Sequence, residues 1–228
     1  MLNLHTTHDI RAVLFDLDGT LADTAPDLAL SLNLLRREQG LPALSLAQIR
    51  PEVSHGSTAL LRLGFGLEAG QPEYAPLRER LLEIYLNHLD CETRLFPGMD
   101  KLLARLEAQH IKWGVVTNKP ASLTEPLMSA LGLDGRAACI ISGDSTAQRK
   151  PHPEPMLQAC RIIDVPGTQC LYIGDARRDI EAGNHAGMKT LVALFGYLAT
   201  NDSPETWQAD GMISHPLEII DWLSCPGA

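Results

Sequence analysis

The sequence predicts an α/β fold in which a parallel sheet is covered by helices and interrupted, after its first strand, by an all-helical insertion. Three observations support this prediction. Residues 12–15 form a short apolar run that ends in acidic and glycine residues, which is typical of a buried parallel strand. Residues 23–92 show helical patterns and no strong strand pattern. After residue 96, strand and helix patterns alternate, as they do in consecutive β-α-β units.

The helical insertion has recognisable helix starts and ends. Thr24 is an N-cap candidate for its first helix, and Gly40 is suited to end that helix. Ser45 and Gln48 match the capping-box pattern, which predicts a second helix start. The helices expected in the insertion cover residues 24–40, a segment that starts after 45, residues 57–63 and residues 73–89.

The rest of the chain is expected to form the sheet and its covering helices. The predicted strands are residues 12–15, 113–117, 139–142, 170–173 and 190–194, and the predicted helices are 99–109, 123–131, 154–163, 179–186 and 216–223. We therefore assign residues 1–22 and 93–228 to one discontinuous α/β core, and residues 23–92 to the helical insertion.

Polar side chains stand at the ends of three predicted strands. Asp16 and Asp18 follow the first strand, Thr117 and Asn118 lie at the end of the second, and Asp175 follows a later one. In open parallel sheets, ligands bind beyond the carboxyl ends of the strands. We therefore expect these three groups to meet in one crevice.

Carboxylates in this arrangement can hydrolyse a phosphate monoester. A carboxylate nucleophile splits the reaction through an aspartyl-phosphate, and Asp16 is the candidate. A second carboxyl can protonate the leaving alkoxide and then accept a proton from water, and Asp18 is suitably placed. Because a phosphate dianion repels a carboxylate, a hard divalent cation such as Mg²⁺ is expected to bind both, with Asp16 and Asp175 as ligands.

The same residues resemble the four signatures of the haloacid dehalogenase superfamily, in order and over nearly the whole chain. The matching segments are Asp16-Leu17-Asp18-Gly19-Thr20-Leu21, Val115-Val116-Thr117-Asn118, Lys150-Pro151 and Gly174-Asp175-Ala176-Arg177-Arg178-Asp179. The resemblance implies a Rossmann-like α/β core with a helical cap of the C1 type, which the insertion would supply.

In the phosphatase branch of that superfamily, the resemblance implies a role for each matched position. Asp16 is the implied nucleophile and Asp18 the implied general acid/base. The hydroxyl and amide groups of Thr117 and Asn118 would bind the phosphoryl group, and Lys150 would steady the charge on nucleophile and phosphate.

The resemblance also implies a magnesium site. Asp16, the backbone carbonyl of Asp18 and Asp175 would hold Mg²⁺, and Asp179 would support these ligands. Ala176 departs from the family pattern, which has a small hydroxyl or acidic residue there, so one contact near the metal is in question.

Substrate contacts are expected from both parts of the chain. His55 and Gly56, in the loop 53–57, would cover the active site, although a simple interhelical turn explains them equally well. Lys119 would contact an acidic leaving group or else remain a surface lysine. Arg177 is preferred over Arg178 for the site, although either can instead cover the start of the helix.

Within the superfamily, the chain resembles the phosphoglycolate phosphatases and the related N-acetylmuramate 6-phosphate phosphatases of cell-wall recycling. We take phosphoglycolate as the first expectation for the substrate and N-acetylmuramate 6-phosphate as the alternative. A sugar-phosphate mutase and a non-catalytic phosphate binder are alternatives of other classes. A dehalogenase is disfavoured because it has no acid/base at the position of Asp18.

Composition limits the partners and the compartment. The formal net charge of -9 has the wrong sign for a nucleic-acid or anionic-membrane binder. A small phosphomonoester is the expected partner, and no oligomeric state is predicted. Five widely spaced cysteines predict reduced, mostly buried thiols. With no signal-peptide or membrane-spanning pattern, a cytoplasmic location is expected.

Overall fold

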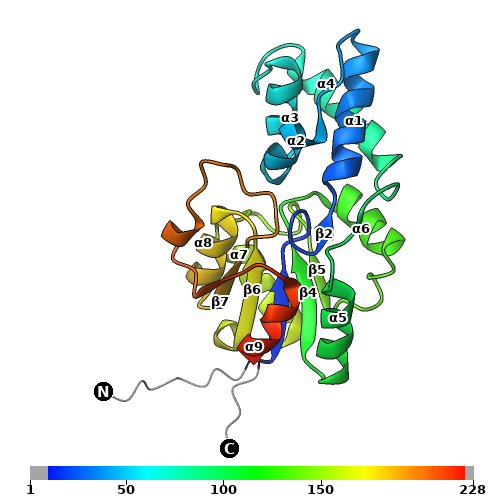
Figure 1. Cartoon of the computed structure of the whole chain (residues 1–228). Helices are drawn as coiled ribbons and strands as arrows, with labels where there is room; N and C mark the ends of the chain where they lie inside the picture. Colours follow the sequence, from blue (N-terminus) through cyan, green and yellow to red (C-terminus); the bar gives the residue numbers. More distant parts are fainter. Residues whose placement is uncertain (1–9, 224–228) are drawn as a thin grey trace, which may run out of the picture.

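A six-stranded parallel sheet forms the centre of the protein, and a group of helices stands beyond one end of it (Figure 1). The structure, a computed structural model, describes residues 10–223. Across the sheet, the strands are β5 (Cys139–Ile141), β4 (Lys112–Val116), β1 (Ala12–Phe15), β6 (Cys170–Gly174), β7 (Lys189–Ala193) and β8 (Gly211–Ile213). Every neighbouring pair is parallel, which confirms the predicted α/β fold class.

Helices cover both faces of the sheet. Side chains alternate along each strand, so each strand contributes residues to both faces. Val13 and Phe15 of β1 pack in the cluster that includes α5 and α6, while Ala12 and Leu14 pack on the opposite face with α7. Both faces of β1 are therefore apolar, which explains its uninterrupted apolar run. The helices of the core are α5 (Met99–Ala108), α6 (Ala121–Ala130), α7 (Glu154–Ile163), α8 (Arg177–His185) and α9 (Ile219–Leu223).

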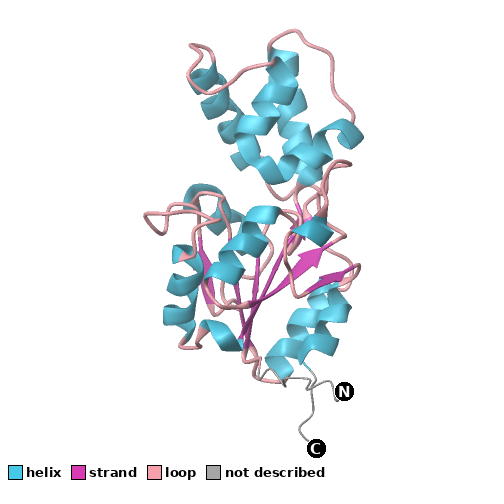
Figure 2. Ribbon diagram, turned by 90° about the vertical axis from the view of Figure 1, so that its left-hand side faces the viewer, coloured by secondary structure: helices cyan, strands magenta, loops and turns pink. Residues whose placement is uncertain are grey.

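A second group of helices, the helical lobe, stands beyond the sheet (Figure 2). Most of its buried apolar side chains pack in one cluster, which Phe96 and Tyr197 of the core also join. The lobe consists of α1 (Ala25–Glu38), α2 (Leu46–Ile49), the 3-10 helix η1 (Arg50–His55), α3 (Gly56–Phe65) and α4 (Tyr74–Leu86). Leu32, Leu61 and Leu81 are among the buried side chains that these elements share. The capping box of Ser45 and Gln48 is confirmed, whereas the expected loop before Gly56 is a 3-10 helix.

The chain enters and leaves the helical lobe through one antiparallel pair, β2 (Ala22–Asp23) and β3 (Arg94–Leu95). Next to this pair, the buried carboxylate of Asp27 accepts hydrogen bonds from the backbone amides of Glu92 and Thr93 and from the Thr93 hydroxyl. The outgoing and returning segments are thereby joined to each other. Neither two-residue strand was predicted from the sequence.

Short 3-10 helices complete the core: η2 (Gly167–Gln169), η3 (Pro204–Thr206) and η4 (Pro216–Glu218), which continues into α9. Cys139, Cys160 and Cys170 are buried free thiols, and Cys91 is an exposed one. The remaining cysteine, Cys225, lies outside the described residues. Between residues 10 and 223, no helix combines the length and the apolar character that crossing a membrane requires.

Candidate active site

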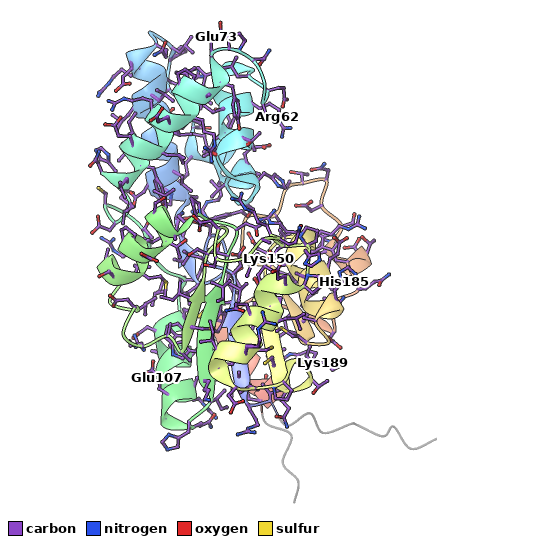
Figure 3. All side chains as sticks on the ribbon, turned by 180° about the vertical axis from the view of Figure 1, so that it is seen from behind. Arg62, Glu73, Glu107, Lys150, His185 and Lys189 are labelled. Carbon is purple, nitrogen blue, oxygen red and sulfur yellow. The ribbon has the colours of Figure 1, made fainter. Side chains whose placement is uncertain are left out.

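The three polar strand ends meet, because β4, β1 and β6 are neighbours in the sheet. Asp16 follows β1, Thr117 follows β4 and Asp175 follows β6. Lys150 comes from the loop between β5 and α7 and reaches the same place. Figure 3 shows Lys150 in the core near the helical lobe, whereas Glu107 and Lys189 lie toward the opposite end of the core.

Lys150 forms the centre of the charged site. Its side chain is fully buried, and its Nζ lies 3.0 Å from Oδ1 of Asp16 and 2.7 Å from Oδ1 of Asp179. The same ammonium donates to the carbonyl of Val116 at 2.8 Å and lies 2.9 Å from the hydroxyl of Tyr172. Contacts to two carboxylates, a carbonyl and a hydroxyl fix the position of this side chain, so Lys150 presents its Nζ at a defined place beside Asp16.

Asp16 is buried but remains ionised. Burial alone would raise its pKa, but the charges of Lys150 and Arg178 and the amide of Leu17 outweigh burial and lower the pKa below its usual value. Lys150 and the amide of Leu17 both contact Oδ1 of Asp16. No described residue donates a hydrogen bond to Oδ2. That oxygen is available to a substrate or a cation.

Asp175 carries the clearest sign of a missing positive charge. Burial, followed by the charges of Asp16 and Asp179, raises its pKa to about 7. Its Oδ2 accepts hydrogen bonds from the hydroxyl of Ser54 and the amide of Tyr197, each at 2.8 Å. Its Oδ1 is buried and has no hydrogen-bond partner among the described residues. An orphaned carboxylate oxygen of this kind calls for a ligand.

The acidic cluster fits a divalent cation. Asp16, Asp175 and Asp179 each offer one carboxylate oxygen, and these oxygens lie within 4.8 Å of one another. Burial, reinforced by the charge of Asp16, raises the pKa of Asp179 despite the neighbouring Lys150 and Arg178. Three buried carboxylates outnumber the two cations beside them, and oxygen ligands of this kind suit a hard metal ion.

The turn after β1 is built to fit around Asp175. Gly19 has a φ of +84°, a left-handed conformation that favours glycine. A Cβ added to Gly19 would collide with the carboxylate of Asp175, and a Cβ on Gly196 would collide with the same side chain. The carbonyl of Asp18 in this turn accepts no backbone hydrogen bond from a described residue. This carbonyl oxygen is therefore available to a metal ion, as expected from the sequence.

Asp18 and Lys119 form an ion pair at the wall of the site. Nζ of Lys119 lies 2.8 Å from Oδ1 of Asp18 and 3.0 Å from the hydroxyl of Tyr85 in α4. Asp18 also accepts a hydrogen bond from the hydroxyl of Thr24 at 2.6 Å. Thr24 therefore binds Asp18 with its side chain and makes no capping bond to α1. Lys119 is thus not a surface lysine: its side chain is buried beside Asp18 and lines the cavity, so its expected contact with a leaving group stays a prediction.

Thr117 and Asn118 have different surroundings. Thr117 is buried, and its hydroxyl accepts a hydrogen bond from the amide of Lys119 at 3.2 Å. The side chain of Asn118 donates to the carbonyl of Lys150 at 3.0 Å and accepts from its amide at 3.1 Å. Asn118 thus holds the backbone of Lys150 in place while it also lines the cavity.

A cavity of about 420 Å³ lies between the core and the helical lobe. Its lining includes Asp16, Asp18, Thr117, Asn118, Lys119 and Arg178 from the core and Ser54, His55, Gly56, Leu81, Leu82 and Tyr85 from the helical lobe. His55 and Gly56 lie at this cavity, and both residues are exposed. The structure thus brings the expected core residues and the expected loop of the helical lobe together.

Arg177 is placed differently from the expectation. Its side chain is 71% exposed and pairs with Glu181 on the surface of α8. Arg178 lines the cavity instead, and its guanidinium donates to the carbonyl of Ser54 at 2.6 Å. Successive residues on a helix point about 100° apart, so the two adjacent arginines face different directions.

Two further residues at the site were not singled out from the sequence, Ser54 and Tyr197, whereas Arg178 was considered and ranked below Arg177. Ser54 lies in the expected loop 53–57 but was not distinguished from its neighbours. Tyr197 follows the carboxyl end of β7. The rule that ligands bind beyond strand ends, applied to this strand as well, would have indicated Tyr197.

An α/β fold that gathers a buried carboxylate cluster and a lysine at its strand ends has the groups that an enzyme with a carboxylate nucleophile requires. The sequence model of the haloacid dehalogenase-like hydrolases matches residues 13–193. The chain belongs to the haloacid dehalogenase-like hydrolase family, which confirms the resemblance found in the sequence.

Similar proteins come from several bacteria. A phosphoglycolate phosphatase of Xanthomonas campestris pv. campestris is 46% identical over 217 residues, covering 95% of this chain and 97% of its own. An N-acetylmuramic acid 6-phosphate phosphatase of Pseudomonas aeruginosa is 42% identical, with coverage of 94% and 95%. A crystal structure from Haemophilus somnus, described as a predicted phosphoglycolate phosphatase, has a TM-score of 0.84 at 28% identity and covers 95% of this chain and 99% of its own.

Proposed function

We propose that this protein is a Mg²⁺-dependent phosphatase that hydrolyses a small phosphomonoester through an aspartyl-phosphate on Asp16. The observation that carries the proposal is the ionised, buried carboxylate of Asp16 beside the ammonium of Lys150 and the orphaned oxygen of Asp175. The similarity to two kinds of phosphatase, each over more than nine-tenths of the chain, supports the same reaction.

In the first step, an oxygen of Asp16 attacks phosphorus and the bond from phosphorus to the ester oxygen breaks. Asp18, in its protonated form, gives its proton to the leaving alkoxide. In the second step, water attacks the aspartyl-phosphate and Asp18 takes up a proton, which releases phosphate and restores Asp16. Both carboxyl groups line the same cavity, as this exchange requires.

Lys150, Thr117 and Asn118 would provide fixed positive charge and hydrogen-bond donors for the phosphoryl group. Lys150 is held by two carboxylates and by the side chain of Asn118, so little reorganisation is needed when charge develops. The amide and hydroxyl groups of Thr117 follow β4 at the wall of the same cavity. The side chain of Asn118 acts here mainly through Lys150.

Asp16, Asp175 and the backbone carbonyl of Asp18 would hold Mg²⁺, with Asp179 supporting the cluster. Bound Mg²⁺ would screen the repulsion between the Asp16 carboxylate and the phosphate dianion. We favour Mg²⁺ over Ca²⁺ because a site with few carboxylates, completed by substrate and water, is typical of magnesium.

We propose that residues 23–92 form the cap over this site and that residues 1–22 and 93–228 form the catalytic core. Most buried apolar side chains of the helical lobe pack in one cluster, and the lobe supplies one wall of the cavity. The paired strands β2 and β3 stand where the chain crosses between the two parts, close to these boundaries. Such a lid would exclude water and select the substrate.

Phosphoglycolate is the first candidate substrate, because the relative with 46% identity carries that name. One observation favours N-acetylmuramate 6-phosphate as the second candidate. The cavity, at about 420 Å³ and with a wall that includes Leu28, Leu82 and Leu123, is large for a two-carbon acid. Pockets of about 300–1,000 Å³ commonly hold ligands of drug size.

The proposed reaction is tested by measuring phosphate release from phosphoglycolate, N-acetylmuramate 6-phosphate, sugar phosphates, nucleotides and pyrophosphate. We expect activity with Mg²⁺, loss of at least about a hundredfold after treatment with a chelator, and recovery on adding Mg²⁺. Ca²⁺ should restore much less, because it prefers more ligands and a looser geometry. Absence of release over the whole panel, or full activity in the chelator, would contradict the proposal.

Leu82→Trp is expected to separate the two candidate substrates. Leu82 lines the cavity from α4, so the larger indole ring should reduce its volume on the side of the helical lobe. If the natural substrate is bulky, kcat/KM for N-acetylmuramate 6-phosphate should fall about tenfold or more, while that for phosphoglycolate changes little. Leu86→Trp, an exposed position on the same helix that does not line the cavity, is the matched control. Equal effects on both substrates would show that the volume of the cavity does not determine which substrate is preferred.

A further inference from the structure

The carboxylate of Asp175 connects the core to the helical lobe. Its Oδ2 accepts one hydrogen bond from the hydroxyl of Ser54, in η1 of the lobe, and another from the amide of Tyr197, in the core. Its Oδ1, buried and without a partner among the described residues, is left for a cation. One side chain of the proposed metal site is therefore held in place partly by the lobe.

Ser54 contacts the core through both its side chain and its backbone. While its hydroxyl donates to Asp175, its carbonyl accepts a hydrogen bond from the guanidinium of Arg178 at 2.6 Å. Asp175 and Arg178 lie on either side of the start of α8. These two bonds can both form only when η1 is seated against that part of the core.

Tyr197 connects the same carboxylate to the point where the chain leaves the core. Its buried hydroxyl accepts hydrogen bonds from the backbone amides of Thr24 and Ala25, at 2.6 and 2.9 Å, and donates to Asp23 at 2.8 Å. The amides belong to the start of α1, so the phenol oxygen takes the place of the capping side chain that Thr24 does not supply.

An ion pair extends this connection into the lobe. Arg50, the first residue of η1, lies 2.7 Å from Asp23 and its guanidinium stands 5.3 Å from the centre of the Tyr197 ring. Asp23, Arg50 and Tyr197 thus form one group at the crossing between the two parts. The position of η1, and with it that of Ser54, is fixed at both of its ends.

We propose that Ser54 and Tyr197 are positioning residues that couple the seating of the helical lobe to the orientation of the Asp175 carboxylate. A cation on Oδ1 of Asp175 fixes that side chain and presents Oδ2 to Ser54 and to the amide of Tyr197. Because such coupling is reciprocal, a seated lobe also strengthens binding of the cation by the same factor. This inference rests on the proposed function, which supplies the cation.

The experiment compares Ser54→Ala and Tyr197→Phe with the unaltered protein, by amide hydrogen exchange with and without Mg²⁺ and by steady-state kinetics. In the unaltered protein, Mg²⁺ should slow exchange in residues 22–27 and 50–56. Ser54→Ala should lose the response of residues 50–56, and Tyr197→Phe that of residues 22–27. In both variants, kcat should fall about tenfold or more, with a smaller change in KM, because the carboxylate is less well oriented.

Two control variants separate this coupling from general weakening of the lobe. Ser45→Ala removes a capping hydrogen bond of α2 at a residue that does not line the cavity, so it should keep the response to Mg²⁺ and the kcat. Ser54→Thr retains a hydroxyl and should keep most of both. The proposal is overturned if Ser54→Ala and Tyr197→Phe respond to Mg²⁺ as the unaltered protein does, or if Ser45→Ala loses the response equally.

The coupling and the proposed function can each fail without the other. If the unaltered protein releases no phosphate from any substrate, the proposed function fails, while hydrogen exchange with Mg²⁺ alone still decides the coupling. If phosphate release requires Asp16 and Mg²⁺ but neither segment responds to Mg²⁺, the coupling is wrong and the phosphatase stands.

Discussion

Asp16→Asn should abolish phosphate release, lowering kcat by roughly 10⁴-fold or more. The amide keeps the size of the side chain but loses the negative charge and nearly all nucleophilicity. It also removes one of the three buried carboxylates that can bind a cation. Steady-state release from the best substrate measures the loss. Acid-quenched samples should retain substrate phosphorus on the peptide containing Asp16 in the unaltered protein and none in the variant.

This loss of activity should not be accompanied by unfolding. Asp16 lies close to the carboxylates of Asp175 and Asp179, and its charge helps to raise the pKa of both. Removing that charge relieves this repulsion but also gives up the ion pair with Lys150, which still pairs with Asp179, so we expect only a small change in the melting temperature. Asp100→Asn, at a side chain that is 77% exposed, is the matched control and should keep full activity. Full activity in Asp16→Asn would exclude the aspartyl-phosphate route.

The central sheet was predictable because each of its long elements carries a local signal. The apolar run at residues 12–15 is buried on both faces, and β1 spans these four residues. The short elements had no comparable signal. β8 has three residues after a long loop and exists through its pairing with β7, and β2 and β3 have two residues each. Strands this short are determined by their partners, which a local pattern does not contain.

The candidate site was predictable in its core and less so at its edges. Asp16, Asp175 and Lys150 lie in motifs at strand ends or beside them, and the sheet order brings them together. The contacts of Tyr197 with Thr24 and Ala25 join residues more than 170 positions apart in the chain. No periodicity or motif records such contacts, because they depend on how the loop after β7 packs against the start of α1.

The choice between Arg177 and Arg178 shows a third limit of prediction from the sequence. Both residues open the same helix with the same charge, and the sequence pattern does not fix which direction the first turn faces. In the structure, Arg178 turns toward the carboxylates and the carbonyl of Ser54, while Arg177 pairs with Glu181 at the surface. The rotation of the helix about its own axis, which is set by packing on the sheet, determines which of the two arginines faces the site.

Lys150→Ala should reduce both activity and stability, unlike Asp16→Asn. The ammonium lies within 3.0 Å of Asp16 and Asp179, and its side chain has no exposed surface. Without it, two buried carboxylates keep only the more distant guanidinium of Arg178 as a counter-charge. Removing one partner of a buried ion pair commonly costs about 3–5 kcal/mol of unfolding free energy. Loss of a fixed donor near the phosphoryl group should lower kcat by roughly a hundredfold to a thousandfold.

Urea unfolding with and without Mg²⁺ measures the stability part of this prediction. Because a bound cation supplies positive charge to the same carboxylates, saturating Mg²⁺ should recover part of the lost free energy but little of the kcat. Lys189→Ala removes an ammonium paired with Asp210 in a partly exposed ion pair, and should cost no more than about 1 kcal/mol. If Lys150→Ala were as stable and as active as Lys189→Ala, the buried ammonium would not be what holds the Asp16 carboxylate ionised and in place.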